Sequence, residues 1–418
     1  MPALSHARPR SSWRLPSTAA FWLMAATLAF LFFASGAPTP LYVVYQAEWH
    51  FSALTLTSVF AVYVLALMTA LVFAGSLSDR VGRRPVLLIA LPVQIGGMVM
   101  FALAQDVDML FAARIVQGLA TGVATGAISA ALIDLQPARR PHLGALISSA
   151  APLLGLAAGA LGAGLLVQYA PAPMRLVFWL LVGVFVLATL AALTMDEPVD
   201  AHRSHWKGAL RPQIGVPREV RGTFVAVAPI IVATWALGGL YLSLGPSLAA
   251  SLLHSSSHVT GGLVIVALAA TGAFASIAAR GHQPEHAMIA GAVLLAAGVG
   301  ITLIGLNQGS TALFFAGSVI AGTGFGPGFA GAFKSIMLLA PPSGRAGLIA
   351  ALYVLAYSGF SLPAIAAGVA VAHQGLLHTT NVYGIAVMVL ALWATGLSVL
   401  RHRRGGFAAA SVAQPARG

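Results

Sequence analysis

Charged side chains that interrupt long apolar runs are the residues of this chain best suited to chemistry. One aspartate and three arginines lie within residues 79–84, and the flanking runs 51–78 and 85–105 contain no Asp, Glu, Lys or Arg. Arg114 lies inside another apolar run, and Gln117 follows three residues later, on the same face if the run is helical. A charge in hydrocarbon costs about 3 kcal/mol on insertion scales, so it indicates a functional role by default. Arg114 could bind an anionic or polar group of a solute, tune a nearby protonatable group, or extend to the outer surface.

Other patterns that could support catalysis or metal binding are weak. The pairs His254/His258 and His282/His286 have the spacing of helical metal ligands, but they lie in short loops without supporting carboxylates. No Asp or Glu lies deep within an apolar run, and there is no cysteine and no phosphate-binding loop. We therefore expect neither an enzyme nor a metal site, and no cofactor.

The elements that must position these residues are membrane helices. The chain is 59% hydrophobic and only 8% charged, so lipid must cover most of its surface. The net charge of +12 could suit a nucleic acid, but the basic residues fall in short loops between apolar runs. Each of twelve runs is long enough to span a bilayer, which predicts an all-α polytopic membrane protein. The spans are expected at about 19–45, 53–77, 85–104, 109–133, 143–168, 174–195, 222–250, 259–279, 287–306, 311–338, 346–372 and 378–400.

Loop charges predict the orientation. With the N-terminus inside, nineteen of the 22 Lys and Arg residues lie on the inner side, the exceptions being Arg114, Arg175 and Lys334. Both termini are then cytoplasmic, and we expect a plasma membrane, the inner membrane of a bacterium. The first apolar run is too long for a cleaved signal, so we expect it to be retained. The predicted segments are a cytoplasmic tail 1–14, a six-helix bundle 15–195, a cytoplasmic linker 196–221, a second six-helix bundle 222–400 and a cytoplasmic tail 401–418.

The two halves show a faint internal repeat. At a constant offset of 204, Gly118 pairs with Gly322, Gly122 with Gly326 and Pro137 with Pro341. Parallel repeats of six spans are a transporter architecture.

With these spans and this repeat, the chain resembles the major facilitator superfamily (MFS) of secondary transporters. The loop between spans 2 and 3, called the signature loop below, resembles the family signature at Gly75, Leu77, Asp79, Arg80, Gly82, Arg83 and Arg84. Arg114, Gln117 and Gly118 resemble the family's span-4 motif. The resemblance implies that the loop forms a conformational latch, in which Asp79 caps span 11 and arginines pair with Asp134. The partners of Asp134 would be Arg80 and Arg83; the alternative is that these charges only anchor the loop and set the topology. The expected latch residues are Gly75, Asp79, Arg80, Gly82, Arg83, Arg84 and Asp134.

The resemblance also extends to span 5 and to the central cavity. Residues 151–155 resemble the antiporter motif of span 5, although Ala151 and Leu156 replace expected glycines. Pro152, Gly155 and Pro327 could let helices flex, or could serve only helix packing. In the family the first and fourth spans of each half line the cavity. Tyr42, Arg114, Gln117, Trp235 and Tyr241 are therefore the expected substrate or coupling contacts. For Tyr42 the alternative is an interfacial belt position, and for Trp235 it is core packing.

These observations predict a secondary transporter that works by alternating access. We expect proton-coupled export of a small organic solute by a monomer in the lipid bilayer, with no nucleic-acid partner. The alternatives are proton-coupled uptake of a small organic acid, with Arg114 as the carboxylate contact, and a non-transporting receptor of the same fold.

Overall fold

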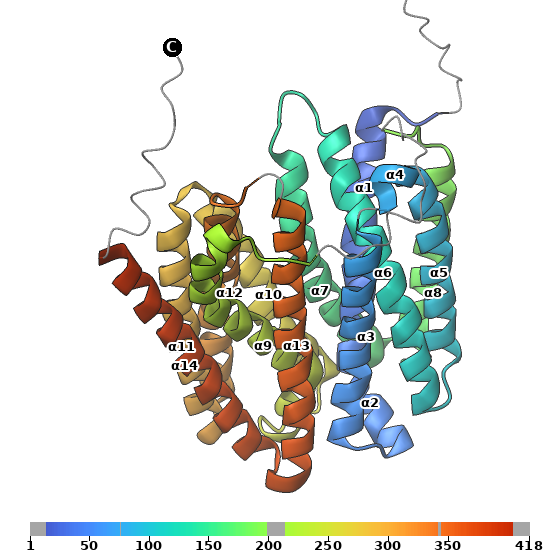
Figure 1. Cartoon of the computed structure of the whole chain (residues 1–418). Coiled ribbons are helices and arrows are strands. Elements are labelled where there is room, and N and C mark those ends of the chain that lie inside the picture. Colours follow the sequence, from blue (N-terminus) through green and yellow to red (C-terminus); the bar gives the residue numbers. More distant parts are fainter. Residues whose placement is uncertain (1–13, 76, 199–213, 342–343, 404–418) are drawn as a thin grey trace, which may run out of the picture.

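The computed structural model describes residues 14–75, 77–198, 214–341 and 344–403, with side chains placed up to Ser398. Its α-helices are joined by short turns, and η2 and η3 are short 3-10 helices (Figure 1). The first-half helices are α1 (Ser17–Gly36), α2 (Pro38–Trp49), α3 (Ala53–Ala74), α4 (Leu77–Val81), α5 (Arg83–Leu103), α6 (Val107–Leu135), α7 (Leu143–Tyr169) and α8 (Leu176–Leu193). The second-half helices are η2 (Arg218–Val220), α9 (Arg221–Ser251), α10 (His258–Ala278), η3 (Ala279–Gly281), α11 (Pro284–Asn307), α12 (Thr311–Met337), α13 (Arg345–Gln374) and α14 (Leu376–Arg403).

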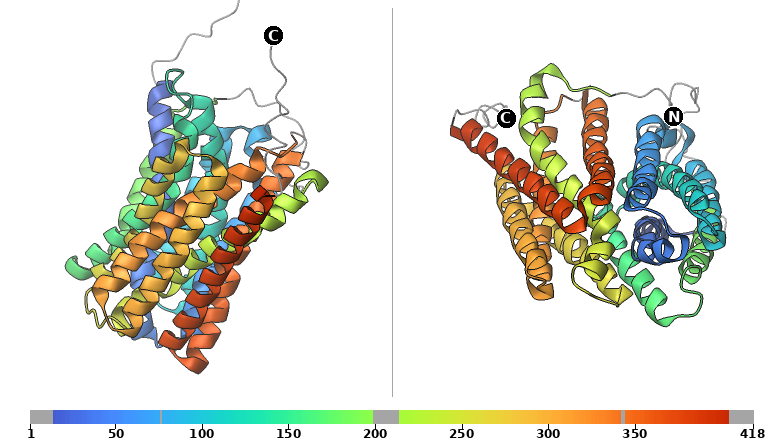
Figure 2. Two further views of the ribbon diagram at one scale, coloured as in Figure 1. Left: turned by 90° about the vertical axis from the view of Figure 1, so that its left-hand side faces the viewer. Right: turned by 90° about the horizontal axis from the view of Figure 1, so that it is seen from below.

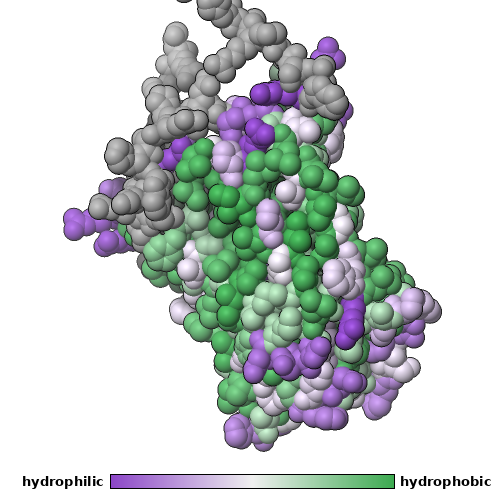
Figure 3. Space-filling view, turned by 90° about the vertical axis from the view of Figure 1, so that its right-hand side faces the viewer, coloured by the Kyte–Doolittle hydropathy of each residue, from purple (hydrophilic) through white to green (hydrophobic). Residues whose placement is uncertain are grey.

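Twelve of the described segments are long and apolar enough to cross a membrane, which confirms the predicted fold class. They agree with the expected spans to within a few residues at most ends. The long uncharged run after residue 286 divides where its turn residues predicted, because α11 ends at Asn307 and α12 begins at Thr311. Figure 3 shows one face of the molecule, where a broad hydrophobic band separates hydrophilic residues gathered toward the two ends. The parts of the linker and tails at 1–13, 199–213 and 404–418 lie outside the described residues.

The helices form two groups that follow the order of the chain. Figure 2 shows α1–α8 and α9–α14 as two bundles side by side when the molecule is seen along its long axis. Below, the end of the molecule that carries α4 is called the α4 end, and the opposite one the α2 end (Figure 1). The described chain begins at the α4 end, and α14 finishes toward it.

The first span differs from the single helix that was expected. It consists of α1 and α2, which meet at Ala37, where Pro38 and Pro40 follow. Proline has no N–H group, so Pro38 cannot donate a hydrogen bond to the carbonyl of Ala34. This leaves a backbone acceptor available inside the membrane segment, and lipid offers no substitute partner.

Contacts between the bundles gather toward the α2 end. The backbone N–H of His258 on α10 donates to Oε1 of Gln168 on α7 at 3.0 Å. A side chain at Gly262 would come within 3.0 Å of Cα of Leu161 on α7, and one at Gly368 of α13 within 3.0 Å of Cα of Leu54 on α3. Such close approach of small residues is the usual means of packing helices in lipid.

Packing between the bundles weakens toward the α4 end. On α10, residues 264, 265, 267–269, 272 and 273 are buried, whereas none of residues 274–278 is. The bundles also diverge toward the α4 end in Figure 1. The described structure is therefore joined at the α2 end and parted at the α4 end.

Candidate functional site

Arg114 is the centre of a buried polar network in the first bundle. It lies on α6 and is 1% exposed. Its Nε and Nη2 donate to the hydroxyl of Tyr42 on α2, at 3.0 and 2.5 Å. Its Nη1 donates to Oε1 of Gln117 at 2.8 Å and to the carbonyl oxygen of Ser35 at 3.3 Å. Three of the expected contact residues, Tyr42, Arg114 and Gln117, are thus in direct contact.

Aromatic rings complete the surroundings of this guanidinium. Its Cζ lies 5.0 Å from the ring centre of Tyr63, 5.5 Å from that of Tyr42 and 5.6 Å from that of Phe101. Each desolvated cation–π contact contributes about 2 kcal/mol, and each hydrogen bond from a charged group about 1.5–3 kcal/mol. Together these contacts can offset the cost of burying the charge. No carboxylate pairs with Arg114 within the described residues, so the positive charge is solvated by neutral groups.

The broken first span explains how this network forms. Nε2 of Gln117 donates to the carbonyl of Ala34 at 2.8 Å, and Pro38 leaves that same carbonyl without a helical donor. Tyr42 follows on α2 with a side chain that is 1% exposed, which does not fit an interfacial belt position. Nor does Arg114 extend to the outer surface, because its guanidinium is enclosed by α1, α2, α3 and α5.

The second bundle has a neutral counterpart of this contact. The hydroxyl of Tyr241 on α9 and Oγ of Ser318 on α12 are 2.7 Å apart. Ser318 follows Arg114 by the same offset of 204 that relates the glycines of the two spans. In each bundle a tyrosine of the first span therefore bonds to the corresponding position of the fourth span. Tyr241 is 2% exposed, so it lies within the packed bundle.

Trp235 belongs to a cluster of aromatic side chains on the second bundle. Its ring makes edge-on contacts with Tyr357 at 4.7 Å, and with Phe329 and Phe360 at 5.4 Å each. Tyr353 continues the cluster, with its ring centre 6.0 Å from that of Tyr357. Trp235 is partly exposed, so it is not sealed within a core.

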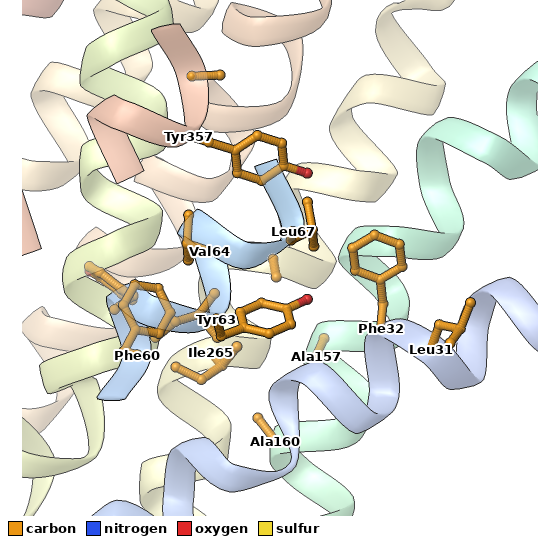
Figure 4. Packing of buried hydrophobic residues seen from close by; sticks show 14 of the residues in the cluster. Leu31, Phe32, Phe60, Tyr63, Val64, Leu67, Ala157, Ala160, Ile265 and Tyr357 are labelled. Carbon is orange, nitrogen blue, oxygen red and sulfur yellow. The ribbon is translucent and has the colours of Figure 1, made fainter. Parts of the chain in front are cut away.

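The aromatic cluster reaches the first bundle. The ring centres of Phe360 on α13 and Phe60 on α3 are 5.1 Å apart. Figure 4 shows Tyr63 and Leu67 of α3 near Tyr357 of α13, with Ile265 of α10 beside Ala160 of α7. The aromatic cluster and Tyr63, whose ring contacts Arg114, therefore lie on opposite sides of one inter-bundle seam.

Arg83 organises the signature loop at the α4 end. Its Nε lies 3.2 Å from Oδ2 of Asp134, and its Nη1 pairs with Asp79 and donates to Oγ of Ser78 at 2.8 Å. Asp134 is thus paired with one of its two expected partners, because Arg80 forms no ion pair within the described residues. Asp79 pairs within its own loop, so the described conformation does not have the expected cap on α13. This arrangement agrees with bundles that are parted at the α4 end.

Glu197 is a functional candidate that the sequence analysis missed. It follows α8, and its two carboxylate oxygens accept hydrogen bonds from the backbone N–H groups of Arg83 and Arg84 at 2.8 and 3.0 Å. A carboxylate at this position stabilises the N-terminus of α5 through its unpaired N–H groups and the helix dipole. Arg84 contacts α8 in turn, because its Nε donates a hydrogen bond to the carbonyl of Ala192 at the end of that helix at 3.2 Å.

Gly82 makes room for this cap. Its φ of 107° is one that L side chains rarely adopt, and an added Cβ would lie 2.6 Å from Oε2 of Glu197. The sequence points to Glu197 only by its position, because it is an acid directly after the sixth span, on the same side as the basic signature loop.

The remaining expected residues lie at close helix contacts or inside helices, and whether the prolines let helices flex stays a prediction. A side chain at Gly126 of α6 would come within 4.0 Å of the Gly75 backbone. An added Cβ at Gly155 would lie 2.5 Å from the carbonyl oxygen of Ala29 on α1. Pro152 and Pro327 lie inside α7 and α12, which both continue through them.

Comparisons with known proteins agree with this architecture. The family model of the Major Facilitator Superfamily matches residues 23–359. The multidrug resistance protein MdtL of Escherichia coli is 26% identical over 309 residues, which cover 72% of this chain and 76% of that protein. MdtL of Shewanella oneidensis is 27% identical over 45% of this chain and 47% of its own length. A triacylglyceride transporter of Mycobacteroides abscessus is 34% identical over 40% of this chain, and the match spans 30% of that protein.

Proposed function

Because this chain belongs to the Major Facilitator Superfamily, a family of membrane transporters, we propose that it exports a small organic solute across the plasma membrane in exchange for protons. The observation that carries the proposal is the pairing of two six-span bundles that are joined at the α2 end and parted at the α4 end. Such a state is one of the two end states of a carrier that works by alternating access. The other state would part the α2 end and close the α4 end.

The charge distribution supports an α4 end that faces the cytoplasm. Arg83, Arg84, Arg139 and Arg140 lie at this end, whereas the described turns at the α2 end contain Arg175 as their arginine. By the positive-inside rule both termini are then cytoplasmic, and the described state is open to the cytoplasm. An exporter in this state is ready to take up its solute.

An uncharged or weakly polar aromatic solute fits the inter-bundle seam best. The second bundle offers the partly exposed ring of Trp235 among other aromatic rings, and edge-on ring contacts each contribute about 0.5–1.5 kcal/mol. The first bundle contributes a fixed positive charge at Arg114 that disfavours cations. The names of the MdtL relatives, multidrug resistance proteins, agree with the export of organic compounds.

Asp134 is our candidate for the carboxylate whose protonation couples proton flow to transport. It is the carboxylate that joins α6 to the signature loop, and its side chain is 28% exposed. Protonation would remove the charge that holds Arg83 and would loosen the loop. The spans offer no acid at mid-depth within the described residues, so coupling at the latch is the simplest arrangement.

The test is transport by the purified full chain in proteoliposomes with an imposed pH gradient. The proposal predicts movement of an uncharged aromatic compound against its gradient, in the direction opposite to proton flow, and loss of this dependence in Asp134→Asn. Movement in the direction of proton flow would instead support uptake. Movement of no solute from a panel of neutral, acidic and basic compounds would support a receptor of the same fold.

A further inference from the structure

The inner ends of α10, α11 and α12 enclose a hollow that the transport proposal does not use. Its volume is about 50 Å³, and it lies at the α4 end of the second bundle. Two basic side chains line it, Arg280 on η3 and Lys334 on α12, together with His282. The rest of its wall includes Pro327 and Gly331, which carry no charge. The hollow is therefore small, positively charged and open to the region near the membrane surface.

The corresponding place in the first bundle is the signature loop. Gly281 and Pro284 have the same separation as Gly82 and Pro85 and follow them by a common offset, which aligns η3 and the start of α11 with α4 and the start of α5. In the first bundle this loop meets three acids, because the side chain of Arg83 pairs with Asp79 and Asp134 and its backbone N–H donates to Glu197.

The second bundle has kept basic residues at this loop but has lost two of the acids. At the offset of 199 residues, which relates Gly82 to Gly281, Ala278 takes the place of Asp79. At the offset of 204 residues, Leu338 takes the place of Asp134. Glu285, in the first turn of α11, is the acid of this region and makes a contact of its own. One carboxylate against Arg280 and Lys334 still leaves an excess of positive charge.

The start of α11 adds to this excess of positive charge. Its N-cap residue, Gln283, makes no side-chain hydrogen bond to the helix. In α5 the N–H groups of Arg83 and Arg84 are bound by the carboxylate of Glu197, whereas the N–H of His282, the counterpart of Arg83, donates to the carbonyl of Ala279 at 3.0 Å. A helix N-terminus favours negative charge.

We infer that the hollow between Arg280, Lys334 and the start of α11 binds a phosphate group. The anion would do for the second bundle what Glu197 does for the first, by tying the inner turn to the neighbouring helices. Two sources share this chemistry: the headgroup of an anionic phospholipid in the adjacent leaflet, and free phosphate. Basic pockets between helices on the cytoplasmic side are suited to such headgroups.

The experiment is native mass spectrometry of the full chain, purified in detergent and given equal amounts of phosphatidylglycerol and phosphatidylcholine. The wild type should retain phosphatidylglycerol in preference. The double variant Arg280→Gln/Lys334→Gln should lose roughly tenfold of that preference, since each basic residue near the surface contributes to binding anionic lipid. The control Arg139→Gln/Arg140→Gln removes equal charge from an exposed turn at the same end and should keep the preference.

Two further measurements distinguish a lipid headgroup from free phosphate and control for misfolding of the variants. Inorganic phosphate that displaces the lipid from the wild type would assign the site to free phosphate, while persistence of the lipid would assign it to the headgroup. Arg280→Lys/Lys334→Arg keeps both charges and should restore retention, which a merely unfolded site would not. Equal retention of both lipids by the wild type, or an equal loss in the two charge-removing variants, would overturn the inference.

Discussion

The two bundles place different chemistry at the same position. In the first, the hydroxyl of Tyr42 accepts hydrogen bonds from Arg114; in the second, Tyr241 meets the hydroxyl of Ser318. The hydrogen bond between the first and fourth spans is thus shared, but only the first bundle places a charge there. The comparison teaches that the pairing of these spans does not require a charge, so the cost of burying Arg114 is consistent with a separate role in transport.

The same contrast holds at the α4 end. The start of α5 is capped by Glu197 and held by ion pairs, whereas the start of α11 borders a positively charged hollow. The first bundle therefore concentrates the charged contacts, and the second supplies the aromatic surface around Trp235. Variants made at matched positions can test this division.

The largest effect is expected for Arg114→Ala compared with Ser318→Ala. The arginine variant leaves the acceptors of Tyr42 and Gln117 without their donor, and losing even two hydrogen bonds from a charged group, at about 1.5–3 kcal/mol each, corresponds to roughly a hundredfold loss of transport. The serine variant should lose about two- to tenfold, as for one neutral hydrogen bond of about 0.5–1.5 kcal/mol. Initial rates in proteoliposomes at equal protein content measure both. Equal losses in the two variants would remove the distinction between the bundles.

Replacement of Trp235 should come next. Trp235→Ala removes several ring contacts from the seam and should raise the KM for an aromatic solute by about tenfold, since each ring contact contributes about 0.5–1.5 kcal/mol. Trp235→Phe keeps a ring and should retain most of the affinity. A change in the maximum rate with an unaltered KM would show that Trp235 acts in packing rather than in binding.

Gly82→Ala and Gly281→Ala compare the two inner turns directly. The first places a Cβ against Glu197 at a positive φ and should destabilise the protein by about 1–3 kcal/mol. The second meets no atom within 4 Å and should be nearly neutral. Thermal unfolding in detergent measures the difference. Equal melting temperatures would show that the glycine of the signature loop is not needed for the cap.

The smallest of these effects is expected for Glu197→Gln. The amide can still accept a hydrogen bond but loses the charge at the helix N-terminus, which contributes about 0.3–1 kcal/mol. Asp196→Asn is the control, because Asp196 pairs with Arg14 and does not cap α5. The melting temperature should fall only in the Glu197 variant. A fall of equal size in both would indicate a general response to lost linker charge.

Much of the fold could be predicted from the sequence because lipid imposes simple rules. Runs of apolar residues must form helices, and the turn at residues 307–310 marks where one long run divides. The spacing of Arg114 and Gln117 likewise places them on one helix face. Contacts between distant segments follow from no local rule. The meeting of Tyr42 with Arg114 depends on the break at Ala37, and the capping of α5 by Glu197 depends on how α8 ends beside the signature loop.

The central claim is that one end of the molecule opens as the other closes. The chain contains no cysteine, so pairs of spin labels can be attached at Gln168/His258 near the α2 end and at Ala145/Ala278 near the α4 end. Electron–electron distance measurements in lipid should show the first pair separating and the second approaching when solute and a proton gradient drive turnover. If both distances stay fixed, or if both change in the same direction, the account of this protein as an alternating-access carrier is contradicted.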